Sequence, residues 1–340
     1  MKLATYQDGS RDGQLVVVSR DLASAHYATG ISSRLQAVLD DWNFLSPQLQ
    51  DLYDNLNAGR VRHGFAFEPE RCMAPLPRAF GQAEGHAYPH HDDIQTLAKA
   101  GEPSAEKSAE PWLRRLGGAE LLGAHDAVGL PDADADFEAG LAVITGDIPV
   151  GCGADRAVEG VRLLMLANGI ALRAQRADAF HARPATAFSP VAVTPDELGT
   201  AWKDGRLAGT LQTTWNGRKV GMCDAGVDMV FHFGELVAAM ARASRVRAGT
   251  IVGSGPVSNA GTPRETARVG RGGRKTQAAG ELEWPRGYGA IAEKRAMEML
   301  QDGAAKTGWL QAHDTLRIEM KGRDGQSIFG AIAHEMLMVD

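Results

Sequence analysis

Several features that mark well-known classes of protein are scarce or missing in this chain. Its 340 residues contain three cysteines, Cys72, Cys152 and Cys223, and none forms a Cys-x-x-Cys pattern. Cysteines that are few, widely spaced and odd in number support neither a disulfide framework nor a zinc site. No run of about 18 apolar residues occurs, and the first residues lack the apolar stretch of a signal peptide. We therefore expect a cytoplasmic protein with no membrane partner.

Positive charge is also scarce. The formal net charge is −6 at pH 7, which argues against nucleic acid as a general partner. The segment GRGGRKT at 270–276 imitates a phosphate-binding loop, but Arg274 stands where such a loop needs glycine before its lysine. We expect no nucleotide binding there. The cations of this segment would instead lie in a solvated loop or cover an anionic ligand as a lid.

Short apolar runs bounded by glycine and proline dominate the chain beyond residue 137. They recur near 141–144, 163–172, 229–233, 250–253, 316–320 and 328–332, and several are rich in Val, Ile and Phe, the residues that favour strands. Helices are predicted at 155–164, 233–244 and 291–300. These patterns predict an α+β fold that is mostly β, with interleaved helices.

The first 75 residues have their own pattern. A strand is predicted at 14–19, and a helix at 46–56, with Ser46 as N-cap and Pro47 at the first helical position. Closely spaced prolines at 75 and 77 cannot continue a helix. They predict a boundary between a small N-terminal domain, residues 1–75, and a larger domain, residues 76–340.

Two negatively charged stretches lie close together before residue 140. The aspartates of 132–136 alternate as in a calcium loop, but the glycine and closing glutamate of such a loop are missing, so a solvated turn is expected. Next come Glu138 and Gly140, which point the same way if the segment is a strand, about 7 Å apart. Two glutamates at that spacing would aim two carboxylates at one hard cation. Here the second position is glycine.

The chain from about Cys72 onward resembles the fumarylacetoacetate hydrolase family. Six blocks carry the resemblance, in order: ITGDIP (144–149), RPATAFSP (183–190), WNGRKVG (215–221), GTIVGSG (249–255), AEKR (292–295) and IFGAI (328–332). The resemblance implies the fold of that family, a mixed β core with peripheral helices after a small N-terminal domain, and homodimers. It also implies hydrolysis of a carbon–carbon bond, or isomerisation, in a small β-dicarbonyl or 2-keto acid, with Mg²⁺ or Mn²⁺ held by an Asp, a Glu-x-Glu pair and a further Asp.

The metal half of this family motif is incomplete in the chain. The first Asp falls on Glu84, seven residues before His91, and the Glu-x-Glu pair falls on Glu138 and Gly140. The last Asp falls on Gly169. Glu84 and Glu138 would thus be remnants of a metal site, so metal binding would be weak or absent. Two glycines facing one pocket suggest that room has been made there.

The acid–base half of the motif is kept. The resemblance assigns catalytic roles to His91 and Glu293, and places Arg183 where the family has its catalytic lysine. An imidazole titrates near neutral pH and can take a proton from water, while a carboxylate fixes its tautomer. Thr250 and Arg183 would bind substrate, since a guanidinium can hold a carboxylate in a bidentate manner. Arg183 would also pair with Glu138 and supply positive charge in place of the metal.

Two functions of different class follow from these residues. The first is an enzyme acting on a small keto acid with little or no metal, since His91, Thr250 and Glu293 are kept. The second is a catalytically silent relative that binds an organic acid or a protein partner, since positions 140, 169 and 183 depart from the family motif. The sequence leaves both open.

Overall fold

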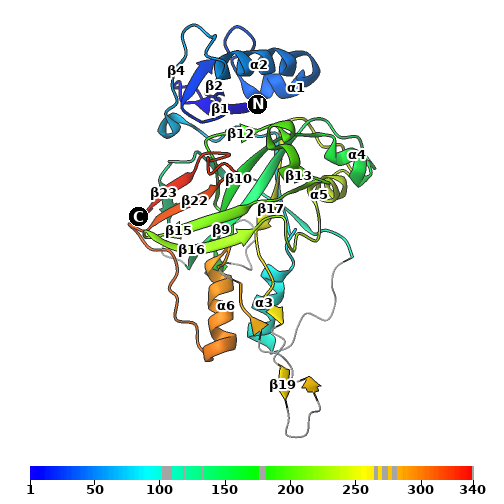
Figure 1. Cartoon of the computed structure of the whole chain (residues 1–340), viewed down its shortest axis with the longest axis vertical. Coiled ribbons are helices and arrows are strands. Elements are labelled where there is room, and N and C mark those ends of the chain that lie inside the picture. The colour runs from blue at the N-terminus through cyan, green and yellow to red at the C-terminus, as the bar shows by residue number, and fades with distance from the viewer. Residues whose placement is uncertain are drawn as a thin grey trace.

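A mixed β-sheet forms the centre of the fold in the computed structural model (Figure 1). The structure describes residues 1–101, 109–117, 119–131, 134–175, 181–263, 267–269, 275–277, 282–285 and 287–338. Within them the large sheet has twelve strands. Its order is β4 (Phe65–Ala66), β3 (Ser24–Tyr27), β2 (Gln14–Val18), β1 (Lys2–Tyr6), β12 (Ala192–Val193), β10 (Val161–Leu172), β9 (Ala135–Thr145), β17 (Thr250–Pro256), β5 (Gly81–Gly85) and β6 (Leu113–Arg115). Outside this path, β11 (Ala185–Phe188) pairs with β10 and β7 (Glu120–Leu122).

A second sheet packs against the first. Its order is β16 (Arg218–Asp224), β15 (Thr210–Trp215), β22 (Thr315–Met320), β23 (Ile332–Met338) and β8 (Val128–Leu130). Three short pairs complete the strands: β13 (Trp202–Lys203) with β14 (Arg206–Leu207), β18 (Thr262–Pro263) with β21 (Leu282–Glu283), and β19 (Ala267–Val269) with β20 (Lys275–Gln277). A fold that is mostly β, with peripheral helices, is confirmed.

Strand β9 is buried along its whole length and separates two apolar clusters. Phe137, Leu141 and Val143 belong to the cluster that includes β22, while Ile144 belongs to the cluster beneath the N-terminal strands. This division follows from the alternation of side chains along a strand. Asp136, Glu138 and Gly140 lie on the same face of β9 as Ile144. This face is therefore polar at the start of the strand and apolar at its end.

Six α-helices surround the sheets in the described residues (Figure 1). They are α1 (Leu35–Asp40), α2 (Trp42–Asn57), α3 (His90–Ala100), α4 (Ala154–Val158), α5 (Phe233–Met240) and α6 (Ile291–Asp302), with 3₁₀ turns at Pro69–Arg71, Arg173–Gln175 and Pro195–Ala201. Helices α3 and α6 lie side by side and pack through Ile94, Ala296 and Met297. The described helices include none with the length and apolar character of a membrane span.

The helix predicted at 155–164 is wrong beyond its first turn. Helix α4 ends at Val158, and β10 begins at Val161. Both faces of β10 are buried, so its apolar run shows no alternation and cannot be told from a buried helix. The apolar run at 229–233 contains no strand. The run at 328–332 reaches a strand only at its last residue, Ile332, where β23 begins. Among the helices, α6 confirms the one predicted at 291–300, and α5 is shorter than predicted.

Two further expectations are corrected or fall outside the described residues. Asp136 lies inside β9 and is completely buried, so it does not belong to a solvated turn. The end of the segment 270–276, for which a solvated loop is one expectation, belongs to the short strand β20. Residues 270–274, which imitate a phosphate-binding loop, lie outside the described residues.

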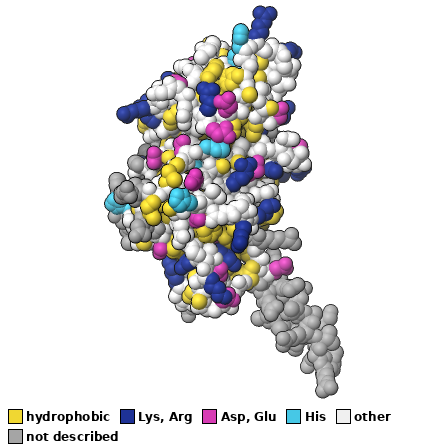
Figure 2. Space-filling view, turned by 90° about the vertical axis from the view of Figure 1, so that its left-hand side faces the viewer, with side chains coloured by type: hydrophobic (Ala, Val, Ile, Leu, Met, Phe, Trp, Pro, Cys, Tyr) yellow, Lys and Arg dark blue, Asp and Glu magenta, His cyan; other side chains and the backbone are white. Residues whose placement is uncertain are grey.

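The N-terminal strands are continuous with the large sheet. Strand β1 pairs with β12 through Lys2 and Val193, and with β2 on its other side. The sheet therefore crosses the boundary that we place near residue 75, and the division into two domains stays a prediction. On the face shown in Figure 2, acidic, basic and apolar side chains are interspersed.

Helix α2 begins at Trp42, so Ser46 is not its N-cap and Pro47 lies inside it. Pro47 has no N–H to donate to the carbonyl of Asn43, and its side chain is exposed. We expect Pro47→Ala to raise the free energy of unfolding by about 1–3 kcal/mol in chemical denaturation. Ser46→Ala is the control and should change it by less than about 0.5 kcal/mol, whereas loss of an N-cap would cost about 1 kcal/mol. A destabilised Pro47→Ala variant would contradict this account of α2.

Candidate functional site

Four neighbouring strands bring the expected metal positions together. Glu138 on β9 lies opposite Gly169 on β10, and Glu84 on β5 lies beside Gly253 on β17. Glu84, Glu138, Gly140 and Gly169 all line one small pocket over this part of the sheet. The sequence motif thus identifies positions that share one site, although they are far apart in the chain.

The two glycines differ in the space around them. A Cβ at Gly169 would meet Glu84 Oε1 at 3.4 Å and Glu138 Cβ at 3.6 Å, which are ordinary contacts. A Cβ at Gly140 would run into the carbonyl oxygen of Gly255 on β17. Gly140 faces Pro256 where the pairing of β9 and β17 shifts register. The expectation that both glycines make room is therefore wrong for Gly140, whose place is taken by backbone.

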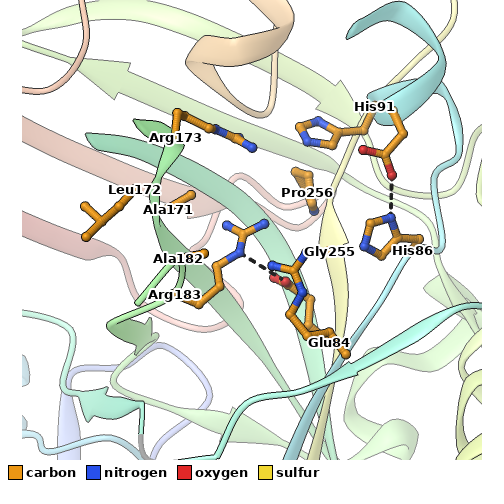
Figure 3. Close-up of a pocket in the computed structure, with 12 residues that line it drawn as sticks. Glu84, His86, His91, Ala171, Leu172, Arg173, Ala182, Arg183, Gly255 and Pro256 are labelled. Atoms are coloured by element: carbon orange, nitrogen blue, oxygen red, sulfur yellow. Dashed lines mark hydrogen bonds and ion pairs between the residues drawn. The ribbon is translucent and has the colours of Figure 1, made fainter. Parts of the chain in front are cut away.

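Buried charges of alternating sign fill the centre of the site, and Figure 3 shows its two arginines, Arg173 and Arg183. Arg183 Nη1 lies 2.5 Å from Glu138 Oε2, and Arg173 Nη2 donates to Glu138 Oε1 at 2.6 Å. Arg173 also donates to Asp136 Oδ2, from Nε at 2.9 Å and Nη2 at 2.6 Å. We call Asp136, Arg173, Glu138 and Arg183 the charge chain. It confirms the expected pairing of Glu138 with Arg183 and adds Asp136 and Arg173, which the sequence analysis missed.

The charges of the chain oppose the effect of burial on the pKa values of its members, and at Glu138 and Arg183 they outweigh it. Burial alone would raise the pKa of Glu138, but the charges of Arg183 and Arg173 hold it well below its usual range. Burial alone would lower the pKa of Arg183, and the charges of Glu138 and Glu84 raise it instead. Asp136 differs, because burial raises the pKa of this carboxyl despite Arg173.

Some polar atoms of the site keep unused bonding capacity. Glu138 Oε2, Arg183 Nη1 and Glu84 Oε2 are buried and make no hydrogen bond of good geometry among the described residues. Arg183 Nε lies 3.6 Å from Glu84 Oε2. Arg183 is held in the site mainly by the negative charges of Glu138 and Glu84.

His91 and Glu293 form a buried pair beside the charge chain. His91 lies in the first turn of α3 and Glu293 in the first turn of α6. His91 Nδ1 and Glu293 Oε1 are 2.6 Å apart, and Glu293 Oε2 accepts from Gly289 N at 3.0 Å. The other ring nitrogen, Nε2, lies 3.8 Å from Glu138 Oε1. The structure thus brings both expected acid–base residues to the site.

The pair sets the protonation of His91. Burial alone would lower the pKa of His91, but the hydrogen bond to Glu293 and the charges of Glu293 and Glu138 raise it above its usual range. With the Nδ1 proton donated to the Glu293 carboxylate, the neutral ring has its lone pair on Nε2, 3.0 Å from Gln95 Nε2. The Gln95 amide donates to that lone pair. Glu293 thereby fixes the tautomer that a base at Nε2 requires.

Asp136 connects the charge chain to the acid–base pair. Its Oδ1 accepts from Ile291 N at 2.7 Å and its Oδ2 from Ala292 N at 3.0 Å. These are the first N–H groups of α6, where a carboxylate also interacts favourably with the helix dipole. The position of Glu293, one residue further on, is therefore fixed by the same aspartate that binds Arg173.

The donors of the site do not fit a divalent cation. Mg²⁺ needs near-octahedral oxygen ligands, and among the described residues no three His, Cys, Asp or Glu side chains form a group that could hold a metal ion. Glu138 has one oxygen bound to Arg173 and the other against Arg183. The guanidinium groups stand where like charge would repel a cation. Of the two expected ligands, Glu84 and Glu138, each keeps one oxygen without a hydrogen bond among the described residues, but that of Glu138 lies against Arg183.

A second cavity of about 30 Å³, partly open to solvent, adjoins these groups (Figure 3). Its polar lining residues are Glu84, His86, His91, Asp92, Arg114, Arg173 and Arg183. Thr250 lines neither this cavity nor the small pocket. Its Oγ1 donates to the carbonyl of Arg247 at 2.7 Å, so the structure does not bring Thr250 to the other expected residues.

The chain belongs to the fumarylacetoacetate hydrolase family. Residues 83–335 match the model of the fumarylacetoacetate (FAA) hydrolase C-terminal domain, and residues 1–78 match that of fumarylacetoacetase N-terminal domain 2. A search of curated protein sequences finds no match.

Solved structures share the whole fold at low sequence identity. A candidate HpcE protein from Mycobacterium smegmatis is 16% identical with a TM-score of 0.66. Maleylpyruvate hydrolase from Sphingobium sp. SYK-6 is 15% identical with a TM-score of 0.62, and has also been solved with manganese(II) and pyruvate. Fumarylacetoacetate hydrolase from Exiguobacterium antarcticum is 16% identical with a TM-score of 0.58. Each comparison covers 100% of both chains.

The unequal space at the two glycines leads to a stability test. We expect Gly140→Ala to lower the free energy of unfolding by about 1–3 kcal/mol, because its Cβ would displace the backbone of β17. Gly169→Ala is the matched control on the neighbouring strand and should stay within about 1 kcal/mol of the unaltered protein. Chemical denaturation measures both. Equal stability of the two variants would contradict the close approach at Gly140.

Proposed function

We propose that this protein is an enzyme that hydrolyses a carbon–carbon bond in a small β-dicarbonyl or 2-keto acid, or isomerises it, without a bound divalent cation. The observation that carries the proposal is the buried pair of His91 and Glu293, with Nε2 facing the charge chain at the edge of the cavity. A histidine with a purely structural role would have no need to line a cavity. Family membership supports the class of reaction.

His91 would move the protons of the reaction. For hydrolysis, a water molecule gives a proton to Nε2 while its oxygen adds to a carbonyl carbon of the substrate. The carbon–carbon bond then breaks, and its electron pair leaves on the departing carbon as an enolate. Nε2 returns the proton to that carbon. Glu293 stabilises the imidazolium between the two transfers, because its carboxylate bonds Nδ1.

Arg183 and Arg173 would bind the substrate and offset the charge that develops on the enolate oxygen. A guanidinium is planar and always charged, and it can hold a carboxylate by two parallel hydrogen bonds. Arg183 Nη1 is buried in the site without a hydrogen bond of its own. Arg183 also lines the cavity that a substrate would enter. Such donors act by position and charge, and supply less polarisation of a carbonyl than a metal ion does.

A catalytically silent binding protein is the second candidate. The observation in its favour is that Glu138 lies between Arg173 and Arg183, so that much of their positive charge is already balanced. A protein of this kind would bind an organic acid or a protein partner and turn nothing over. The two candidates differ in whether His91 is needed for any reaction.

Turnover in chelator separates the two candidates. With 2,4-dioxopentanoate or oxaloacetate as substrate and excess EDTA, we expect product formation that His91→Ala reduces by about 10²–10⁴-fold. His90→Ala is the matched control, since its ring bonds Ser258 Oγ and does not line the cavity. Turnover that disappears in EDTA, or that survives in His91→Ala, would contradict the proposal. No turnover of either acid would favour the silent protein.

The pH dependence tests the role of Glu293. A base at Nε2 must be neutral, so kcat/KM falls as the pH drops below the pKa of His91, which lies above its usual value of about 6.5. Glu293 raises that pKa, so in Glu293→Gln the acidic limb should move to lower pH while kcat also decreases. A limb that keeps its position would mean that it reports another group.

A further inference from the structure

Arg114 is the arginine of the cavity that none of the preceding assignments uses. It lies on β6, opposite Glu84 in the pairing with β5, and it lines the cavity together with His91 and Arg183. Its side chain is half-buried. Within the described part of the chain it forms no ion pair, unlike Arg173 and Arg183.

An aromatic platform fixes the position of this guanidinium. Arg114 Cζ lies 5.3 Å from the centre of the Trp112 ring, within the range of a cation–π contact. The ring of His86 meets that of Trp112 edge to face, with centroids 4.3 Å apart. His86 Nδ1 in turn lies 2.5 Å from Asp92 Oδ2. Trp112 is 50% exposed, and the two residues that it contacts, Arg114 and His86, line the cavity.

Arg114 has no ion pair at close range among the described residues. Burial and the nearby charge of Arg183 both lower the pKa of Arg114, whereas the charges of Glu84, Glu138 and Asp92 raise it. Glu84 is closer to Arg183, at 3.6 Å from its Nε, and is not within ion-pair distance of Arg114. A cation that is partly removed from water and lacks a partner gains most from a ligand that carries the missing negative charge.

We infer that Arg114, held on Trp112, is a specificity-determining residue that binds a second carboxylate of the ligand at the open end of the cavity. The inference rests on the proposed function for the reactive end, where the keto-acid group meets Arg183 and His91. It assigns the ligand to the dicarboxylic 2-keto acids. Such a ligand would join two cationic sites within one cavity, and a monocarboxylic acid would reach only the inner one.

Binding of two acids that differ in one carboxylate tests the inference. We would titrate the full chain with pyruvate and with 2-oxoglutarate, and follow the heat of binding. The unaltered protein should bind 2-oxoglutarate at least about tenfold more tightly. Arg114→Gln should weaken that binding by about 10- to 100-fold, as expected for loss of one charge-assisted hydrogen-bonded contact, and change pyruvate binding by less than about twofold. Arg114→Lys should lie between the two.

Arg115→Gln is the matched control, because Arg115 is the next residue of β6, is exposed and does not line the cavity. Trp112→Leu should lose part of the affinity for 2-oxoglutarate, since the guanidinium then lacks its platform. Equal weakening of both acids in Arg114→Gln, or an unaltered protein that binds 2-oxoglutarate no more tightly than pyruvate, or binds neither, would overturn the inference. Binding needs no turnover, so a silent protein would still give the expected pattern, and inactivity alone would not overturn it.

Discussion

The position of Glu138 between Arg173 and Arg183 is the contact on which the rest of the site depends. Glu138 lies on β9, in the middle of the large sheet. Its two oxygens fix Arg173, which follows β10, and Arg183, which precedes β11. Arg173 binds Asp136, Asp136 bonds the first N–H groups of α6, and α6 carries Glu293 to His91. A single buried carboxylate thus connects the substrate-binding arginines to the acid–base pair.

This arrangement has an energetic consequence. Buried ion pairs often gain little net stability, because removing both charges from water costs several kcal/mol, but removing one partner leaves an uncompensated charge. The charge chain therefore serves to fix geometry more than to stabilise the fold. It also explains which ligands the site can bind. Glu138 is committed to the arginines, and the backbone of β17 occupies the space beside Gly140. The site therefore offers cationic donors to an anion. Arg114 extends that surface to the open end of the cavity.

Much of the site could be predicted from the sequence, because the family motif marks Glu84, His91, Glu138 and Arg183 in order. What it missed has physical reasons. Asp136 stands in an acidic run that looks solvated, and only the extent of β9 shows it to be buried. Arg173 and Arg114 have no motif, and their roles depend on which strands are neighbours. The helix wrongly predicted at 155–164 shows the same limit, because a strand buried on both faces has no alternation of polar and apolar residues.

The most direct test of the account is a calorimetric titration of the chelator-treated protein with Mn²⁺, with Glu138→Gln measured beside it. If Glu138 is committed to Arg173 and Arg183, the unaltered protein shows no saturable binding of Mn²⁺ up to a concentration of about 1 mM. This corresponds to a binding free energy weaker than about 4 kcal/mol. Tight stoichiometric binding that Glu138→Gln abolishes would contradict the account, because it would mean that Glu138 leaves the arginines to hold a metal.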